Sequence, residues 1–210
     1  MKVQILPILL ALATTTIADL QASTLCFVNA LPLAEKIDFL YKGEKIRPYP
    51  FEEGGYTLCL QVPSGPLPFT VEDPNKGSVP LTANPESGKH KTAVVFEKSE
   101  MNPETNEIKK KHAILHVPQV GPPTGKPATF RVAYVGGISP LSFTIGTETF
   151  ELEPNTFSDV KTAPLNHDVR TSASAEPWQV AFEEPTVYIL IIFRGSDGKL
   201  RHTIAYESIY

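Results

Sequence analysis

A stretch of ten residues rich in proline and glycine, from Pro118 to Pro127, most constrains what this chain can fold into. It reads PQVGPPTGKP and holds four prolines and two glycines. Proline lacks a backbone N–H and has a fixed φ, so the stretch can continue neither a strand nor a helix. It therefore predicts a semi-stiff, extended linker between two separate segments of the chain.

Both segments have the pattern of short β-strands separated by turns. Residues 36–41 (KIDFLY) and 56–62 (YTLCLQV) alternate in polarity, as half-buried strands do, and residues 91–97 (KTAVVFE) predict the most buried strand of the first segment. The Asp-Gly pair within residues 196–198 predicts a two-residue hairpin turn. Residues 98–106 are polar, contain a proline and predict a loop.

The remaining predicted strands give both segments a similar order of elements. They cover residues 23–30, 68–72, 78–82, 109–117, 127–135, 140–146, 148–152, 157–162, 168–174, 178–182, 186–193 and 200–206. Pro80 makes 78–82 either an edge strand or an irregular one, and residues 23–117 and 128–210 show no helical period with caps. The chain is therefore predicted to be all-β, with two tandem antiparallel β-sandwich (immunoglobulin-like) domains at 23–117 and 128–210, joined by the linker 118–127.

The N-terminus has the pattern of a secretory signal peptide over residues 1–22. A charged start at Met1 and Lys2 precedes an apolar run from Val3 to Ala13, and cleavage is predicted after Ala18 or Ala22. The run is shorter than the roughly 20 residues of a membrane span. An uncleaved anchor is the alternative interpretation. We therefore expect a secreted or periplasmic protein.

Two cysteines, Cys26 and Cys59, both lie in the first segment. An even count in an exported protein permits a disulfide, and both residues fall on the less apolar side of their predicted strands. Closing the loop between them would stabilise the fold by roughly 3–4 kcal/mol. Two free thiols are the alternative.

Part of the first segment resembles the DUF4397-like β-sandwich repeats. The resemblance is carried by residues 27–30 (FVNA), 37–43 (IDFLYKG) and 62–65 (VPSG), with Phe51 and the Gly55-Tyr56 pair between them. The second segment has Val135-Gly136-Gly137 in place of the Asn-Ala pair and matches in strand pattern only. Two repeats after a signal peptide are similar to the periplasmic accessory protein family of alginate O-acetylation. The resemblance implies an exported adaptor and carries over no catalytic residue.

No motif in the sequence carries an obvious chemistry. His112 and His116 would lie about 13 Å apart on a strand, too far for one ion, so no metal site is predicted. A nucleophile elbow and a glycine-rich phosphate loop are both missing from the sequence. The net charge of −4 gives no basic footprint for nucleic acid. We predict no enzyme activity and no cofactor.

Trp178, the only tryptophan, is the single candidate for a ligand contact. The alternative is that it packs in a sandwich core. The function predicted is that of an exported, non-catalytic adaptor for an envelope or secreted protein, accessory to polysaccharide modification or envelope assembly. The alternatives are a structural surface or matrix protein, and a carbohydrate-binding module or carbohydrate-active enzyme.

Overall fold

The computed structural model describes residues 22–32, 36–56, 59–118, 128–146, 148–163, 167–171, 178–182 and 186–206. Apart from residue 22 and Pro118, the predicted signal peptide and linker lie outside these ranges. Every regular element within them is a β-strand, as the sequence predicts. The described residues include no helix of the length and apolarity that a bilayer crossing needs.

The first half of the chain forms two four-stranded sheets. The first outer sheet has the order β3-β2-β5-β6, and the first inner sheet has the order β4-β1-β7-β8. The strands are β1 (Ser23–Ala30), β2 (Asp38–Tyr41), β3 (Glu44–Lys45), β4 (Leu60–Val62), β5 (Leu67–Asp73), β6 (Gly77–Ala83), β7 (His90–Met101) and β8 (Ile108–Pro118). β6 lies at a sheet edge, where the unpaired side tolerates Pro80, so the structure selects the edge strand from the two predicted alternatives.

The second half repeats this arrangement. The second inner sheet has the order β12-β9-β16-β17 with β13 also paired to β9, and the second outer sheet has the order β11-β10-β14-β15. The strands are β9 (Ala128–Tyr134), β10 (Leu141–Ile145), β11 (Glu148–Leu152), β12 (Thr156–Phe157), β13 (Lys161–Ala163), β14 (His167–Thr171), β15 (Trp178–Val180), β16 (Val187–Arg194) and β17 (Leu200–Tyr206).

The two halves share one topology, including a pairing that the sequence did not predict. β1 runs parallel to β7, and β9 runs parallel to β16, whereas the other pairs of strands are antiparallel. The prediction of purely antiparallel sheets is therefore wrong at these two pairs. Alternation of side chains does not distinguish the two directions, because it has a period of two in both.

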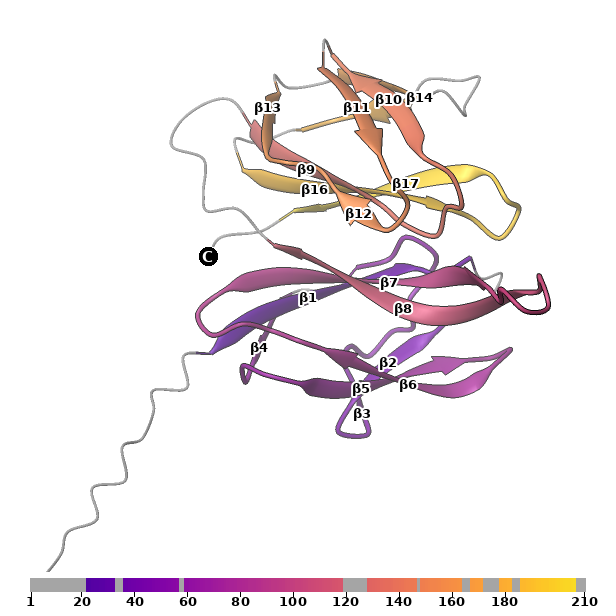
Figure 1. Cartoon of the computed structure of the whole chain (residues 1–210). Coiled ribbons are helices and arrows are strands. Elements are labelled where there is room, and N and C mark those ends of the chain that lie inside the picture. Colours follow the sequence, from indigo (N-terminus) through magenta and orange to yellow (C-terminus); the bar gives the residue numbers. More distant parts are fainter. Residues whose placement is uncertain are drawn as a thin grey trace, which may run out of the picture.

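The four sheets are stacked as layers, with the two inner sheets in the middle (Figure 1). Each inner sheet packs on the outer sheet of its own half around a core of aromatic and aliphatic side chains, as in a β-sandwich. Phe27, Phe39 and Phe69 are central to the first core, and Phe130 and Phe143 lie in the second.

A third apolar core joins the two inner sheets. Val28 and Val94 from the first half, and Ala133 and Ile191 from the second, are all completely buried there. β1 and β16 are therefore buried on both faces. The prolines between the halves led us to expect separate domains on a stiff spacer, but the halves lie directly against each other.

Two predicted boundaries in the hairpins are wrong. β7 continues through residues 98–101, which were predicted as loop, because β8 pairs with it as far as Met101 and Ile108. The hairpin at 196–198 is not a two-residue turn, since the loop between Arg194 and Leu200 spans residues 195–199. Gly198 still adopts the positive φ of 76° that the Asp-Gly pair predicted. The strand predicted at 157–162 is divided between β12 and β13.

Candidate binding sites

The two cysteines form a disulfide, as predicted, and the alternative of two free thiols is excluded. Cys26 on β1 lies opposite Cys59, in the register set by the pairing of Leu25 with Leu60. The side of β1 that carries Cys26 appeared less apolar in the sequence. That side faces the second half of the chain, and Cys26 is buried.

The disulfide holds one end of a long loop that only the first half possesses. This loop, called here the Arg47 loop, covers residues 46–59 between β3 and β4, whereas β11 and β12 in the second half are separated by residues 153–155 alone. A repeated scaffold with one lengthened loop indicates where a specific role has been added, because loops on rigid scaffolds carry binding sites.

Arg47 organises the loop with its guanidinium group. Nε donates to the carbonyl of Tyr49 at 2.8 Å, Nη1 to that of Tyr56 at 3.1 Å, and Nη2 to that of Pro50 at 2.7 Å. The guanidinium carbon also lies 3.8 Å from the centre of the Phe51 ring, which is completely buried. The planar guanidinium group thereby holds three carbonyls and a ring at once. Lysine could not do this, because its ammonium group is a compact point charge.

The Arg47 loop forms one wall of an open groove of about 860 Å³. The groove is lined mainly by apolar surface, from Ile46, Pro48, Tyr49, Pro50, Tyr56 and Leu60, with Lys36, Arg47 and Glu52 among the polar residues. The side chain of Tyr49 is 75% exposed. Lys36 and Glu52 form an ion pair of 2.7 Å, so both charges are already partnered. The groove therefore suits a largely neutral ligand that stacks on an aromatic ring.

The Arg47 loop also contacts the second half of the chain. Glu53 forms an ion pair of 2.7 Å with Arg201 and accepts a hydrogen bond from the N–H of Ser196. The Thr203 hydroxyl donates to the carbonyl of Gly54 at 2.8 Å. Both halves therefore hold the groove in place.

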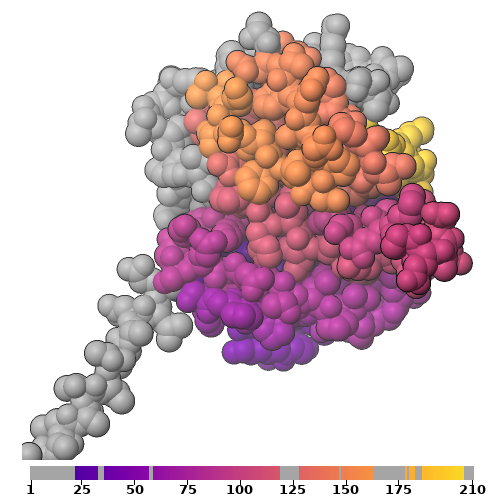
Figure 2. Space-filling view, in the orientation of Figure 1, coloured from indigo at the N-terminus to yellow at the C-terminus, as the bar shows by residue number. Residues whose placement is uncertain are grey.

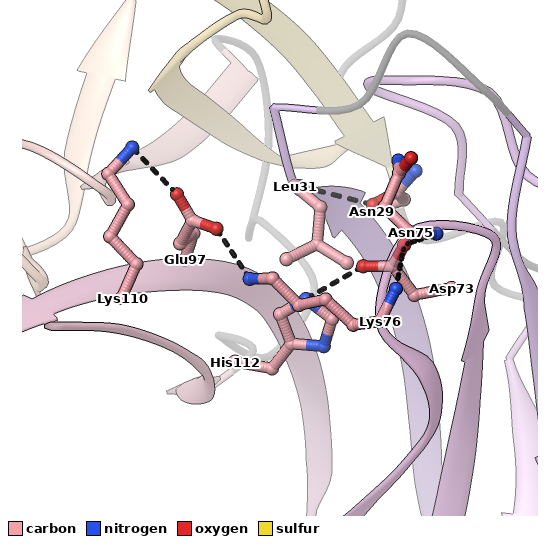
Figure 3. Close-up of polar contacts among 8 residues, drawn as sticks. All are labelled: Asn29, Leu31, Asp73, Asn75, Lys76, Glu97, Lys110 and His112. Atoms are coloured by element: carbon pink, nitrogen blue, oxygen red, sulfur yellow. Dashed lines mark hydrogen bonds and ion pairs between the residues drawn. The ribbon is translucent and has the colours of Figure 1, made fainter.

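A second polar site lies inside the first sandwich, where Asp73 meets His112 (Figure 3). Nε2 of His112 lies 3.1 Å from Oδ2 of Asp73, and the exposed fractions of the two side chains are 1% and 0%. The other carboxylate oxygen of Asp73 accepts the N–H groups of Asn75 and Lys76, which shapes the turn after β5. Nδ1 of His112 has no hydrogen-bond partner among the described residues.

Burial lowers the pKa of His112, and the ammonium group of Lys76 lowers it further. The carboxyl groups of Asp73 and Glu97 oppose this shift without reversing it. The imidazole is therefore favoured in its neutral form. A pair this deeply buried stabilises the end of the sandwich and does not have the accessibility that a general base requires.

Next to this pair, a small pocket opens where the two halves meet. It has a volume of about 250 Å³ and is called here the seam pocket; its walls include Glu97, Ser99, Lys110, Gly136, Arg194 and Ser196. Glu97 accepts from Lys76 at 2.7 Å and from Lys110 at 3.0 Å, as Figure 3 shows. One carboxylate thus lies between two ammonium groups.

Trp178, the predicted ligand contact, lines neither the groove nor the seam pocket. It is partly buried against the second core, and its ring stacks on His202 with centroids 4.8 Å apart. This position agrees with the alternative of a core residue. Cys26 and Cys59 lie in the other half, so the structure does not bring the predicted site residues together into one site.

The histidines on β8 lie on a strand, as predicted, and hold different partners. His112 contacts Asp73, whereas Nε2 of His116 accepts the N–H of Asn84 at 3.0 Å. Within the part of the chain that the structure describes, no three or more His, Cys, Asp or Glu side chains gather as metal ligands would.

Sequence reasoning did not find the Arg47 loop or the Asp73–His112 pair. A signal existed for Asp73, which continues the inward alternation of Leu67, Phe69 and Val71 along β5. No local pattern marked Arg47, because its three acceptors are backbone carbonyls that any residue supplies.

Comparison with protein-family models finds no family that matches this chain, and comparison with curated proteins likewise finds no match. The resemblance to DUF4397-like repeats therefore stays a prediction.

Proposed function

We propose that this chain is an exported, non-catalytic adaptor that binds a partner of the cell envelope or secreted space through the Arg47 groove. In this proposal the two halves are immunoglobulin-like domains derived from one repeat. The disulfide and the signal-peptide pattern of residues 1–22 support export.

The observation that carries the proposal is the Arg47 loop itself. The scaffold is the same in both halves, yet only the first has a lengthened loop between these strands, and that loop forms the larger of the two cavities described above. Arg47 and the disulfide pre-organise it, which reduces the ordering cost of binding. Tyr49 is left exposed where a partner would contact it.

The chemistry of the groove supports binding in preference to catalysis. Three N–H groups of Arg47 donate to carbonyls and its face lies on a ring, while Lys36 and Glu52 neutralise each other. Neither Arg47 nor the Lys36–Glu52 pair offers an unengaged acid or base beside a nucleophile.

The test is a comparison of proteins captured from envelope extract by the mature chain and by Tyr49→Ala, read by mass spectrometry. Ile138→Ala is the matched control, because Ile138 is 77% exposed and lies outside the groove. We expect a specific partner, including components of polysaccharide modification or export, to be retained by Ile138→Ala and lost from Tyr49→Ala. Equal capture by both variants would reject the groove as the binding site.

Carbohydrate binding is a second candidate, favoured by the exposed ring of Tyr49 beside Tyr56 in a groove where Lys36 and Glu52 are already paired. Sugar rings stack on such aromatic faces. A glycan array would decide between the two: binding of a neutral glycan that Tyr49→Ala abolishes and Trp178→Ala leaves intact would replace the protein partner by a sugar.

A further inference from the structure

The seam pocket lies at a strand edge that the sheet leaves open. β1 pairs with β7 only as far as Ala30 opposite Phe96, whereas β8 continues along the other side of β7 to Met101. No strand of the described residues occupies the β1 side of β7 beyond Phe96. The pocket is lined there by Glu97 and Ser99.

The backbone of Ser99 points into this opening. The N–H of Thr24 on β1 donates to the carbonyl of Lys89, just before β7. N–H and C=O groups of alternate residues point to the same side of a strand. The backbone groups of Glu97, Ser99 and Met101 therefore point to the β1 side of β7, as the carbonyl of Lys89 does. An open edge with this geometry is a template for pairing with another strand.

Two cations stand beside the opening. The Arg194 side chain donates one N–H to the carbonyl of Gly198 at 2.9 Å and lies near the Tyr134 hydroxyl. Because a guanidinium has five N–H donors, Arg194 can still donate to a ligand. Among the residues that line the pocket, Lys110 and Arg194 are cations and Glu97 is the one acid, which Lys110 shares with Lys76.

The same edge has an apolar end. Met101 and Ile108 face each other across the β7–β8 hairpin and are 65% and 57% exposed. They lie two residues beyond Ser99 and Lys110 on the same face of the hairpin, a distance of about 7 Å along the strand. Figure 2 shows this hairpin standing out at one side of the molecule, beyond the stacked sheets.

We propose that the seam pocket and the open edge of β7 capture the extended C-terminus of a partner protein. The terminal carboxylate binds to Arg194 and Lys110, the preceding backbone pairs with Ser99 and Met101, and an apolar side chain packs on Met101 and Ile108. The captured strand would extend the first inner sheet in line with β1. Strand addition supplies backbone hydrogen bonds, and the charged pocket fixes the end of the peptide.

A small free anion would satisfy the cations but would leave the edge and the apolar pair without a role. The site is separate from the Arg47 groove, since the two cavities share no lining residue. The proposal therefore goes beyond the proposed function, and it survives if Tyr49→Ala proves to have no effect on any partner.

The test uses a fluorescent hexapeptide of alternating threonine and valine, titrated into the mature chain and followed by anisotropy. We expect the free-carboxylate peptide to bind at least tenfold more tightly than its C-terminal amide. Arg194→Gln and Lys110→Gln should each remove most of this preference. Lys109→Gln is the matched control, because Lys109 is the neighbouring lysine on β8 and does not line the pocket.

The edge is tested at Ser99. Ser99→Pro removes the N–H that points into the opening, whereas Ser99→Ala keeps it, so only the proline variant should weaken binding by tenfold or more. Melting curves of all variants, and unchanged peptide binding by Tyr49→Ala, separate loss of the site from loss of the fold.

Three results would overturn the proposal: equal binding of acid and amide, equal binding by Ser99→Pro and Ser99→Ala in folded proteins, or peptide binding no tighter than that of acetate. The last result would reduce the pocket to an anion site.

Discussion

Asp73 and His112 show how a single polar pair can close the end of a sandwich. Each side chain is almost completely buried. Among the described residues, neither has a second ion-pair partner. Removing one partner leaves the facing atom of the other, Oδ2 of Asp73 or Nε2 of His112, buried without that contact, which costs more than the pair contributes as a whole.

We expect Asp73→Ala and His112→Ala each to lower the free energy of unfolding by about 3 kcal/mol, and the double variant to lose clearly less than the sum. Asp73→Asn should cost less than Asp73→Ala, because an amide oxygen can still accept the N–H groups of Asn75 and Lys76. Urea unfolding of the four variants measures these changes in the free energy of unfolding. Additive losses would show that the two side chains act independently.

Three histidines predict how stability depends on pH. Burial lowers the pKa of His112, His116 and His202, with nearby lysines adding to the shift at the first two. The histidines of the unfolded chain have pKa values near 6.5. Just below that pH the unfolded chain therefore binds more protons than the folded chain. Stability therefore falls as the pH drops through about 6.5 towards the lowered folded values.

We expect the melting temperature to be lower at pH 5.5 than at pH 7.5, and the difference to be smaller in His202→Phe. Phenylalanine does not titrate and can still stack on Trp178. Differential scanning calorimetry at both values gives the comparison. An unchanged difference in the variant would mean that His202 contributes nothing to the pH dependence.

At the scale of the element, the Arg47 loop depends on a side chain and a disulfide in place of a strand ladder. Between Ile46 and Cys59 it forms isolated bridges at Phe51 and Tyr56. Arg47 adds hydrogen bonds to the carbonyls of Tyr49, Pro50 and Tyr56. Loops without a continuous strand ladder open locally at lower cost once one of their contacts is removed.

Arg47→Lys should therefore destabilise the loop more than the fold. We expect a loss of about 1–2 kcal/mol in global stability, since an ammonium group cannot reach all three carbonyls in one plane. Hydrogen exchange of the amides in residues 46–56 should accelerate, while that of β7 stays slow. Lys45→Arg, on the exposed strand just before the loop, is the control and should leave exchange unchanged.

At the scale of the whole molecule, the third core makes the halves one folding unit. Val28, Val94, Ala133 and Ile191 are completely buried only because the inner sheets lie against each other. The Glu53–Arg201 ion pair and the Thr203–Gly54 hydrogen bond join the same halves at the Arg47 loop. An interface of this apolar character resembles a sandwich core more than a contact between mobile domains.

We expect the chain to unfold in a single calorimetric transition. Ala133→Glu places an unpaired charge between the inner sheets and should lower the melting temperature by about 10 °C or split the transition in two. Thr82→Glu, on exposed β6, is the control and should melt as the parent chain does. Two transitions in the parent chain would show that the halves fold independently.

The sequence by itself determined the all-β class, the positions of most strands and the repetition of one order of elements, and it permitted the pairing of Cys26 with Cys59. These features follow from local information: alternation with a period of two, turn residues, and parity of side chains along a strand. Pro80 narrowed β6 to an edge strand or an irregular one for the same reason.

Only the tertiary structure decided how the halves meet and where the sites lie. The side of β1 predicted to be less apolar became a buried interface, because the opposing surface comes from β9 and β16, which lie far away in the chain. The partners of Arg47, Asp73 and Arg194 are likewise backbone groups or distant side chains. Local patterns record which face of a strand is apolar, but the third dimension decides what covers it.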